Sequence, residues 1–135
     1  QLARDFGNAE IFTGARTAER HYYLDECQKI ADVHIATDDG TLGFQGFVTE
    51  MLRARLQEMS KQELENIMFY NCGPAPMVHA AAAVQREFCG DHQIHSAIDY
   101  LTKCGVGICG ACATPEGKRI CVDGPFIQGD PAPRS

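Results

Sequence analysis

The chain has 135 residues, of which 44% are hydrophobic, and its formal net charge at neutral pH is −6. This length suits one ordinary domain or a domain with a small appendage, and the composition is that of a globular protein with a core. The acidity argues against nucleic acids and anionic membranes as partners, and no stretch approaches the ~18 apolar residues of a spanning helix. We therefore expect neither a nucleic-acid partner nor insertion into a membrane.

The first third of the chain alternates short apolar runs with amphipathic segments. Residues 1–7 have the pattern of the end of a helix, as if the polypeptide began inside a larger fold. Residues 9–14 and 33–37 are apolar runs typical of buried strands, and residues 18–30 between them have helical spacing, with Thr17 as the expected N-cap. A strand, a helix and a second strand within about 30 residues predict a parallel sheet with crossover connections.

Residues 38–46 predict a loop, since they contain three glycines and two acids, Asp38 and Asp39. In an open α/β sheet, a loop at the carboxyl end of a strand lies where ligands bind. A plain turn with Asp39 at its corner explains the same composition equally well. Both interpretations remain open at this point.

The middle of the chain predicts two helices around a third strand. Residues 47–61 are amphipathic, residues 62–66 form a polar connection, and residues 67–71 form the strand. The strand ends at Cys72, and an alanine-rich helix is expected over residues 77–88, preceded by prolines that suit a first turn. A helix N-terminus at a sheet edge attracts phosphate or carboxamide oxygens, although Cys72 by itself is better explained as a small buried residue.

Residues 104–125 contain four of the seven cysteines, with the spacing C-x4-C-x2-C-x8-C. The first three match the plant-type spacing of a [2Fe–2S] cluster, whose fourth ligand comes from further along the chain. Glycines among them allow the backbone to wrap tightly and to direct N–H groups at sulfur. The four candidate ligands are Cys104, Cys109, Cys112 and Cys121.

Zinc is the main alternative for these cysteines. A zinc site would use two separated C-x2-C knuckles or added histidines, whereas only one pair is two residues apart and no histidine lies between Cys104 and Cys121. Disulfides fit less well, because the neighbouring glycines suit a wrapped loop. Residues 105–110 spell G-x-G-x-x-G, but Cys112 and a turn follow instead of a helix, so we reject a dinucleotide loop there.

We expect two domains: a partial NAD(P)-binding domain over residues 1–90 and a cluster-binding module over residues 91–135. In the module, a hairpin turn at residues 115–117 would return Cys121 to the other ligands, and residues 129–133 would form a frayed end. Reduced thiols and an iron–sulfur centre indicate a cytoplasmic setting.

Several stretches together carry a family resemblance: Gly-Ala-Arg-Thr at 14–17, Thr-Asp-Asp-Gly at 37–40, Gly-Phe-Val-Thr at 46–49, Cys-Gly-Pro-Ala-Pro-Met at 72–77 and the cysteine module with residues 100–110 and 121–125. In this order they resemble the C-terminal part of the electron-transfer subunit of dihydroorotate dehydrogenase type B, a member of the ferredoxin–NADP⁺ reductase superfamily. The resemblance covers nearly the whole chain. Similar layouts occur in gamma subunits of cytoplasmic sulfhydrogenases and in small subunits of NADH-dependent ferredoxin–NADP⁺ oxidoreductases and sulfide dehydrogenases. Some of those small subunits have an aspartate at the first ligand position, so Cys104 favours the dihydroorotate or hydrogenase branch.

The resemblance implies an α/β fold, with a truncated ferredoxin-reductase-like parallel sheet and helices followed by a small [2Fe–2S] module with a β-hairpin. It implies FAD and NAD(P) as cofactors of the full-length protein. The FAD-holding β-barrel and the first strand with its Gly-rich turn are absent from this sequence, so the fragment alone is expected to be inactive. NAD(P)H would exchange a hydride with FAD, and the cluster would pass single electrons to a catalytic partner.

That partner is expected to be dihydroorotate dehydrogenase, in pyrimidine biosynthesis. The alternatives are a hydrogenase partner, with this chain as a sulfhydrogenase gamma subunit, or an NAD(P)H:ferredoxin oxidoreductase, with this chain as its small subunit. Outside this class, the hypotheses are a zinc-stabilised structural module and a stand-alone ferredoxin-like carrier.

The resemblance implies that the four cysteines are the ligands of the cluster. It also implies that residues 14–17 lie along the adenosine half of the nucleotide. Residues 72–74 would lie near the nicotinamide ring and the flavin, and the two acids of the 38–46 loop either contact the nucleotide or shape the loop. The candidate nucleotide contacts are Gly14, Ala15, Arg16, Thr17, Asp38, Asp39, Cys72, Gly73 and Pro74.

Overall fold

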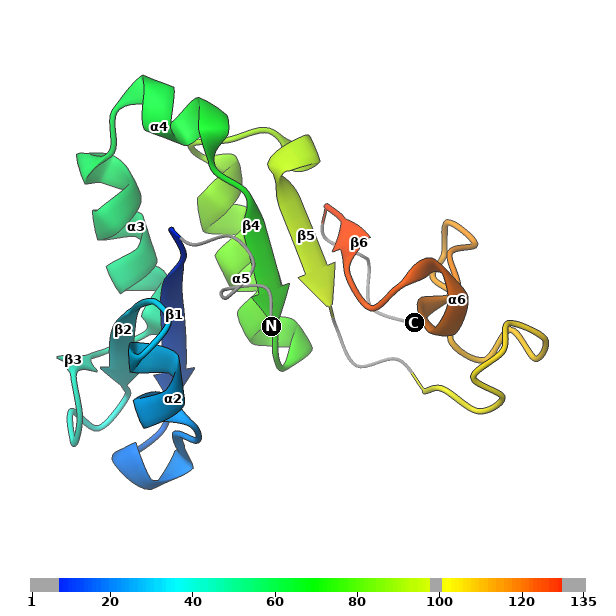
Figure 1. Cartoon of the computed structure of the whole chain (residues 1–135), viewed down its shortest axis with the longest axis horizontal. Coiled ribbons are helices and arrows are strands. Elements are labelled where there is room, and N and C mark those ends of the chain that lie inside the picture. The colour runs from blue at the N-terminus through cyan, green and yellow to red at the C-terminus, as the bar shows by residue number, and fades with distance from the viewer. Residues whose placement is uncertain (1–7, 98–100, 130–135) are drawn as a thin grey trace. The chain divides into compact units, whose positions relative to one another are not determined.

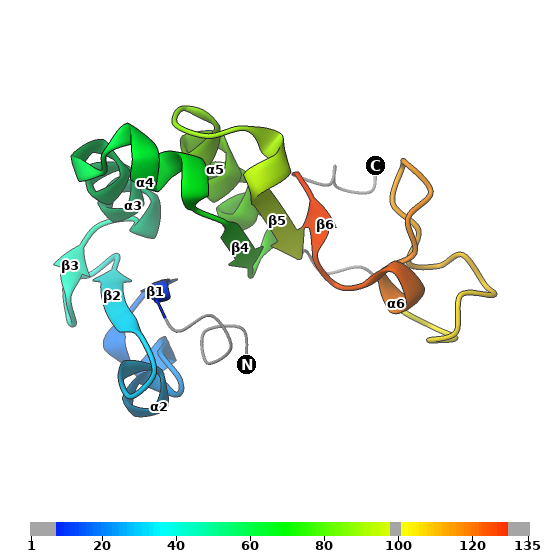
Figure 2. The ribbon, with the colours of Figure 1, turned by 45° about the horizontal axis from the view of Figure 1, so that its top comes forward.

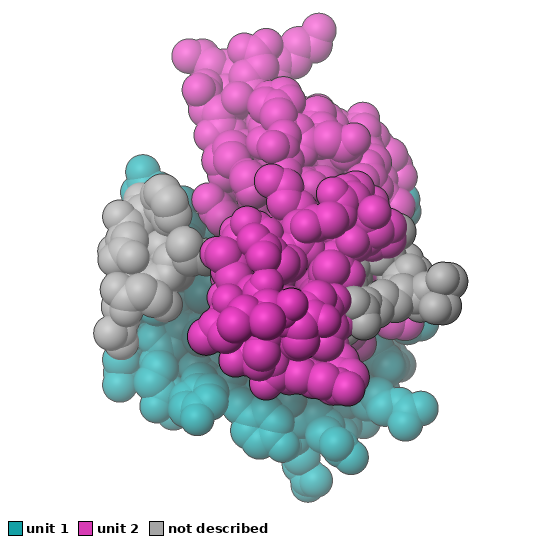
Figure 3. All heavy atoms as spheres, turned by 90° about the vertical axis from the view of Figure 1, so that its right-hand side faces the viewer, with its two compact units in different colours: residues 1–57 teal, residues 58–135 magenta. Residues whose placement is uncertain are grey.

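The structure, a computed structural model, describes residues 8–97 and 101–129. It divides into two compact units, residues 1–57 and residues 58–135 (Figure 3), and each unit has its own three-stranded sheet (Figures 1 and 2). The helix end expected over residues 1–7 and nearly all of the expected tail lie outside the described residues. The domain boundary expected between residues 90 and 91 stays a prediction.

The first unit is built on a parallel sheet, as the strand–helix–strand pattern predicts. Its strand order is β1 (Glu10–Ala15), β2 (Asp32–Thr37) and β3 (Phe44–Gln45). The β1–β2 register runs from Glu10 opposite Asp32 to Ala15 opposite Thr37, so both strands end at the same edge. The two-residue strand β3 lies within the predicted 38–46 loop and pairs with the end of β2.

The single helix expected over residues 18–30 is wrong. The segment forms a short 3₁₀ helix, η1 (Ala18–Arg20), and one turn of α-helix, α2 (Leu24–Gln28). Tyr23 between them has φ 59°, a left-handed conformation that interrupts a right-handed helix. Thr17 precedes η1 but makes no capping hydrogen bond with its side chain, because its hydroxyl lies 3.3 Å from the hydroxyl of Thr41 instead.

Helix α3 (Val48–Glu58) runs along β1 and buries the apolar side of the predicted amphipathic segment. Leu52 and Leu56 are its buried side chains. At its start the helix approaches β1 so closely that a Cβ on Gly14 would lie 2.9 Å from the Cβ of Val48. Further along, Arg55 donates to both carboxylate oxygens of Glu10, at 3.0 and 2.7 Å. Gly14 therefore has a packing role in addition to its predicted place beside a nucleotide.

The second unit has a mixed sheet in the order β4 (Phe69–Cys72), β5 (Ile94–Ala97) and β6 (Ile127–Gln128). β4 and β5 are parallel, β6 is antiparallel to β5, and helix α5 (Ala75–Arg86) packs against β4 and β5. Helix α5 begins two residues earlier than predicted, because Pro74 takes the N-cap position and Pro76 fits the first turn. The core of this unit contains Val78, Ala82 and Val84 from α5, Phe69 from β4 and Ile94 from β5.

The polar connection expected over residues 62–66 is instead helix α4 (Lys61–Asn66). Ser60 and Glu63 form a capping box there, in which the Glu63 N–H donates to the Ser60 hydroxyl and the Ser60 N–H donates to the Glu63 carboxylate at 2.8 Å. The Ser-x-x-Glu spacing is a helix-start signal that the polar composition obscured. The short helix η2 (Asp91–Gln93) then leads into β5. In the described parts of the chain, no helix is long and apolar enough to cross a membrane.

A buried polar network joins α5 to the sheet of the second unit. The side-chain amides of Asn71 and Gln85 exchange two hydrogen bonds of 2.8 Å, and Asn71 also donates to the Ser96 hydroxyl at 3.3 Å. Gln85 and Ser96 are almost fully buried. The network fixes the strand end that leads directly into Cys72.

Replacing Asn71 with alanine is expected to lower the unfolding free energy by about 1–3 kcal/mol, because the buried Gln85 amide loses both partners. Urea denaturation measures the change. Asn66→Ala is the matched control, since the Asn66 amide donates to the Gln62 carbonyl at an exposed site. Equal losses in both variants would contradict a stabilising role for the network.

Candidate metal centre and nucleotide edge

The four candidate ligands lie in one irregular loop and the short helix that closes it. Residues 101–119 form turns and bends, helix α6 (Ile120–Asp123) carries Cys121, and β6 then returns the chain to β5. The hairpin turn expected at residues 115–117 is present: Ala113 bridges Arg119, and the Thr114 N–H donates to the Lys118 carbonyl at 2.7 Å. No helix follows residues 105–110, in agreement with rejecting a dinucleotide loop there.

Backbone N–H groups are directed at sulfur within this loop, as its glycine content predicts. The Cys109 N–H donates to the Cys104 sulfur and the Ala111 N–H donates to the Cys109 sulfur, both at 3.5 Å. Gly107 has φ 78°, and the Arg119 guanidinium donates to its carbonyl at 2.7 Å. This hydrogen bond connects the first half of the loop to Arg119, the N-cap residue of α6.

Hydrogen bonds from backbone N–H groups make two of these thiols, Cys104 and Cys112, more acidic. The backbone N–H of Cys109, followed by that of Val106, lowers the pKa of the Cys104 thiol to about 6. The N–H of Cys121 lowers the pKa of Cys112, whereas hydrogen bonding to the Cys112 thiol raises the pKa of Cys121. The Cys104 and Cys112 thiols therefore lose their protons more readily, and the thiolate is the form that binds metal.

The donor set fits an iron–sulfur cluster in its chemistry. All seven cysteines of the chain are free thiols, and the four candidates differ in exposure: Cys104 and Cys109 are exposed, Cys121 is half-buried and Cys112 is buried. Among the described residues, no three histidine, cysteine, aspartate or glutamate side chains converge closely enough to hold a metal ion. The assignment of the four cysteines as ligands therefore stays a prediction.

At the carboxyl edge of the first sheet, the structure brings together the two predicted nucleotide segments of that unit. The Asp38 N–H donates to the Ala15 carbonyl at 3.1 Å, and the Asp39 N–H donates to the Arg16 carbonyl at 3.2 Å. Residues 14–17 and the 38–46 loop therefore lie side by side where β1 and β2 end, the edge at which open α/β sheets bind ligands.

Asp39 shapes its own loop in this structure. Its carboxylate accepts hydrogen bonds from the hydroxyl and the N–H of Thr41, at 2.6 and 3.0 Å. The Thr41 hydroxyl chiefly holds the pKa of this carboxyl below its usual range. The Thr41 oxygen also accepts the Ala18 N–H at 2.8 Å, which links the loop to η1. A nucleotide contact by either Asp38 or Asp39 stays a prediction.

Sequence reasoning missed the residues that hold this edge in place. His21 bridges the two strands, with its ring nitrogens 3.2 Å from the Ala36 carbonyl and 3.3 Å from the Thr13 hydroxyl. Buried Thr37 donates to the Leu42 carbonyl at 2.7 Å and thereby closes the loop. An Asp followed two residues later by Thr is a turn signal that could have pointed to Thr41; nothing local in the sequence points to His21.

The other three candidate nucleotide contacts belong to the second unit. Cys72 is the last residue of β4 and is exposed, so the interpretation of Cys72 as a small buried residue is wrong. Gly73 follows it, and Pro74 is the N-cap of α5. The sequence therefore places a strand end, a glycine and a helix N-terminus in direct succession. Any role of these residues beside the nicotinamide ring stays a prediction.

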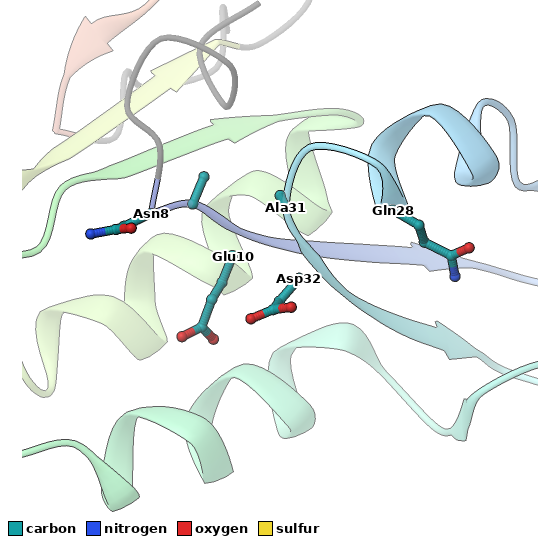
Figure 4. A pocket seen from close by; sticks show the side chains of 6 residues that line it. Asn8, Glu10, Gln28, Ala31 and Asp32 are labelled. Atoms are coloured by element: carbon teal, nitrogen blue, oxygen red, sulfur yellow. The ribbon is translucent and has the colours of Figure 1, made fainter.

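A surface pocket lies at the opposite end of the first sheet, where β1 and β2 begin (Figure 4). Glu10 and Asp32 line it from the two strands, and it contains none of the predicted site residues. The Arg55 side chain lowers the pKa of Glu10 through its hydrogen bonds. Glu10 is thus occupied by an ion pair, and the pocket adds no ligand site.

Two protein-family models match the chain. Residues 1–83 match the oxidoreductase NAD-binding domain, and residues 101–131 match the iron–sulfur cluster binding domain of dihydroorotate dehydrogenase B. The two matches follow each other in the order that the motifs predict, with the NAD-binding match before the cysteine loop.

Curated relatives have the same description. The chain is 36% identical over 118 residues to a probable dihydroorotate dehydrogenase B (NAD(+)) electron transfer subunit of Methanocaldococcus jannaschii, covering 87% of the chain and 43% of the relative. It is 34% identical over 136 residues to the electron transfer subunit of Listeria welshimeri, covering 96% and 49%. The chain thus spans about half the length of these curated relatives.

A solved structure shares the fold. One chain of a study on flavin-based electron bifurcation by the NADH-dependent reduced ferredoxin–NADP oxidoreductase superposes with a TM-score of 0.73 and is 26% identical in sequence. The match covers 92% of this chain and 44% of that one. The ferredoxin-reductase-like fold predicted from the motifs is confirmed.

Proposed function

Because the chain belongs to the family of dihydroorotate dehydrogenase B electron transfer subunits, we propose that it relays electrons between a nicotinamide–flavin site and a catalytic partner subunit through a [2Fe–2S] cluster. The observation that carries the proposal is the cysteine loop, where backbone N–H groups donate to the sulfurs of Cys104 and Cys109. Such hydrogen bonds stabilise thiolates and tune the potential of a cluster that they hold.

The chain's own residues have separate tasks in this function. Cys104, Cys109, Cys112 and Cys121 would hold the cluster, which supplies one-electron transfer when bound. Cys112 is buried against the second unit's core and anchors the loop, whereas Cys104 and Cys109 are exposed on its outer side. In the first unit, residues 14–17 would bind the adenosine half of NAD(P), on an edge that Thr37 and Thr41 hold in shape.

The partner is a catalytic oxidoreductase subunit, and dihydroorotate dehydrogenase of pyrimidine biosynthesis is the first choice because the curated relatives have that name. Large apolar side chains stand exposed on and beside the cysteine loop, a composition that suits a protein partner. These are Leu101, Val106, Ile108 and Val122. The second candidate is a small subunit of an NAD(P)H:ferredoxin oxidoreductase, which the structural neighbour supports; a hydrogenase gamma subunit is the third.

The proposal extends to the whole protein of which such a chain forms part. FAD and NAD(P) are the cofactors that the proposal assigns to the full-length protein. Seven free thiols and an iron–sulfur centre suit the cytoplasm.

Visible absorbance tests the proposal against a zinc-stabilised module. The anaerobically purified chain should be brown, contain iron and acid-labile sulfide, and bleach with dithionite. A colourless chain with one tightly bound zinc would overturn the proposal. Mixing the full-length protein with candidate catalytic subunits then identifies the partner, because only the correct one couples its substrate to reduction of NAD(P)⁺.

Cys72→Ala is expected to leave the cluster spectrum intact and to slow hydride transfer in the full-length protein. Cys72 lies at the end of β4 on the side predicted to face the nicotinamide ring, whereas it is absent from the ligand spacing. Stopped-flow reduction by NAD(P)H measures the rate, and Cys27→Ala serves as the control. A normal rate in Cys72→Ala would mean that Cys72 has no role in hydride transfer.

A further inference from the structure

A small buried core joins helix α5 to the cysteine loop within the second unit. Val78 of α5 and Cys112 of the loop are almost fully buried, with 1% and 2% of their surface exposed, and they pack together. Ala75, Ile120 and Cys121 pack against this pair. Two of the four predicted ligands, Cys112 and Cys121, therefore belong to the core around Val78.

Val78 lies in the first turn of α5, directly after the segment predicted to lie beside the nicotinamide ring. The Val78 and Met77 N–H groups both donate to the Pro74 carbonyl, at 3.1 and 3.0 Å. On the loop side, the Cys112 carbonyl accepts the Ile120 N–H at 3.2 Å. The contact thus connects residues 72–74 to the predicted ligands through a short, hydrogen-bonded path.

We infer that Val78 is a positioning residue for the cluster: it seats Cys112 and the start of α6 against α5 and keeps water from the Cys112 sulfur. The inference rests on the proposed function. An apolar shell around a metal site controls solvent access and local dielectric, and through them the reduction potential. Cys112 is the only one of the four predicted ligands that is buried. The apolar surroundings of its sulfur are therefore the ones that a single side chain of α5 can alter.

Val84 provides a matched control on the same helix. It is also buried, with 4% of its surface exposed, but it is not part of the core formed with Cys112. Val78→Ala and Val84→Ala remove the same two methyl groups from α5. A difference between them in cluster properties therefore reports on the contact with Cys112 and not on the loss of packing in general.

The test uses the chain with its cluster reconstituted from iron and sulfide. Val78→Ala should lose iron to a chelator about 10-fold faster than wild type, the lower end of the usual effect of removing outer-shell support. Its midpoint potential, from a redox titration followed by visible absorbance and EPR, should be more positive because water reaches the Cys112 sulfur. Val84→Ala should lower the melting temperature comparably and leave iron loss and potential at wild-type values.

Val78→Thr keeps the inference testable if Val78→Ala does not fold. Threonine retains the branched shape and adds a hydroxyl beside Cys112, so the potential should become more positive while the protein stays folded. The inference is overturned if iron loss is equal in Val78→Ala and Val84→Ala, or if Val78→Thr has the wild-type potential. A wild-type chain that binds no cluster would instead overturn the proposed function, and with it this inference.

Discussion

Cys109→Ser is expected to lose nearly all bound iron and sulfide, whereas Cys27→Ser should retain the wild-type content. Cys109 has a double role in the loop: its sulfur accepts the Ala111 N–H, and its own N–H donates to the Cys104 sulfur. Serine replaces a soft thiolate with a poor donor for an iron–sulfur cluster. Losing a ligand should weaken metal binding at least as much as losing an outer-shell partner, which costs about 10–100-fold.

Iron and acid-labile sulfide per chain, together with visible absorbance, measure this effect. Cys27 is the appropriate control because it is a half-buried free thiol on α2, in the other unit and outside the cysteine spacing. Melting temperatures without the cluster separate loss of ligand from loss of fold. An unchanged iron content in Cys109→Ser would contradict the assignment of Cys109 as a ligand.

Periodicity predicted the elements whose packing repeats along the sequence. The strands β1, β2 and β4 and the helices α3 and α5 were located to within about three residues, because alternating or helical apolar spacing reflects burial directly. The break at Tyr23 was missed because helical spacing continues across it, whereas the backbone there is left-handed. The short elements α6 and β6 depend on contacts with β5 and α5, which no local pattern contains.

The site was predictable where chemistry fixes the spacing of residue types and unpredictable where packing decides. Four cysteines at ligand spacing identify a cluster loop without a structure. Which cysteine is buried depends on Val78, which lies 34 residues before Cys112 in the numbering of the chain and meets it only in the fold. Similarly, the sequence allowed Asp39 to be either a nucleotide contact or a turn residue. Its hydrogen bonds with Thr41 depend on the folded loop.

Gly43→Ala is expected to be the most destabilising change at the nucleotide edge, and Gly40→Ala in the same loop is its matched control. The two glycines have nearly the same left-handed backbone, with φ 69° and 72°, so alanine costs about 1–2 kcal/mol at either position. Their surroundings differ. A Cβ on Gly43 would run into the backbone carbonyl of Ile35 in β2, whereas a Cβ on Gly40 would meet the flexible side chain of Gln45 at 2.9 Å.

The Gln45 side chain can rotate away from a new methyl group, but the Ile35 carbonyl lies in the middle of a paired strand and cannot. Gly43→Ala should therefore lose about 1–3 kcal/mol more unfolding free energy than Gly40→Ala, the usual cost of overpacking. Urea denaturation of both variants measures the difference. In the full-length protein, Gly43→Ala should also weaken NAD(P) binding, because displacing the loop from β2 breaks the edge formed with residues 14–17. Equal stability of the two variants would mean that the loop shifts freely on β2, and the proposed nucleotide edge would then lack a rigid support.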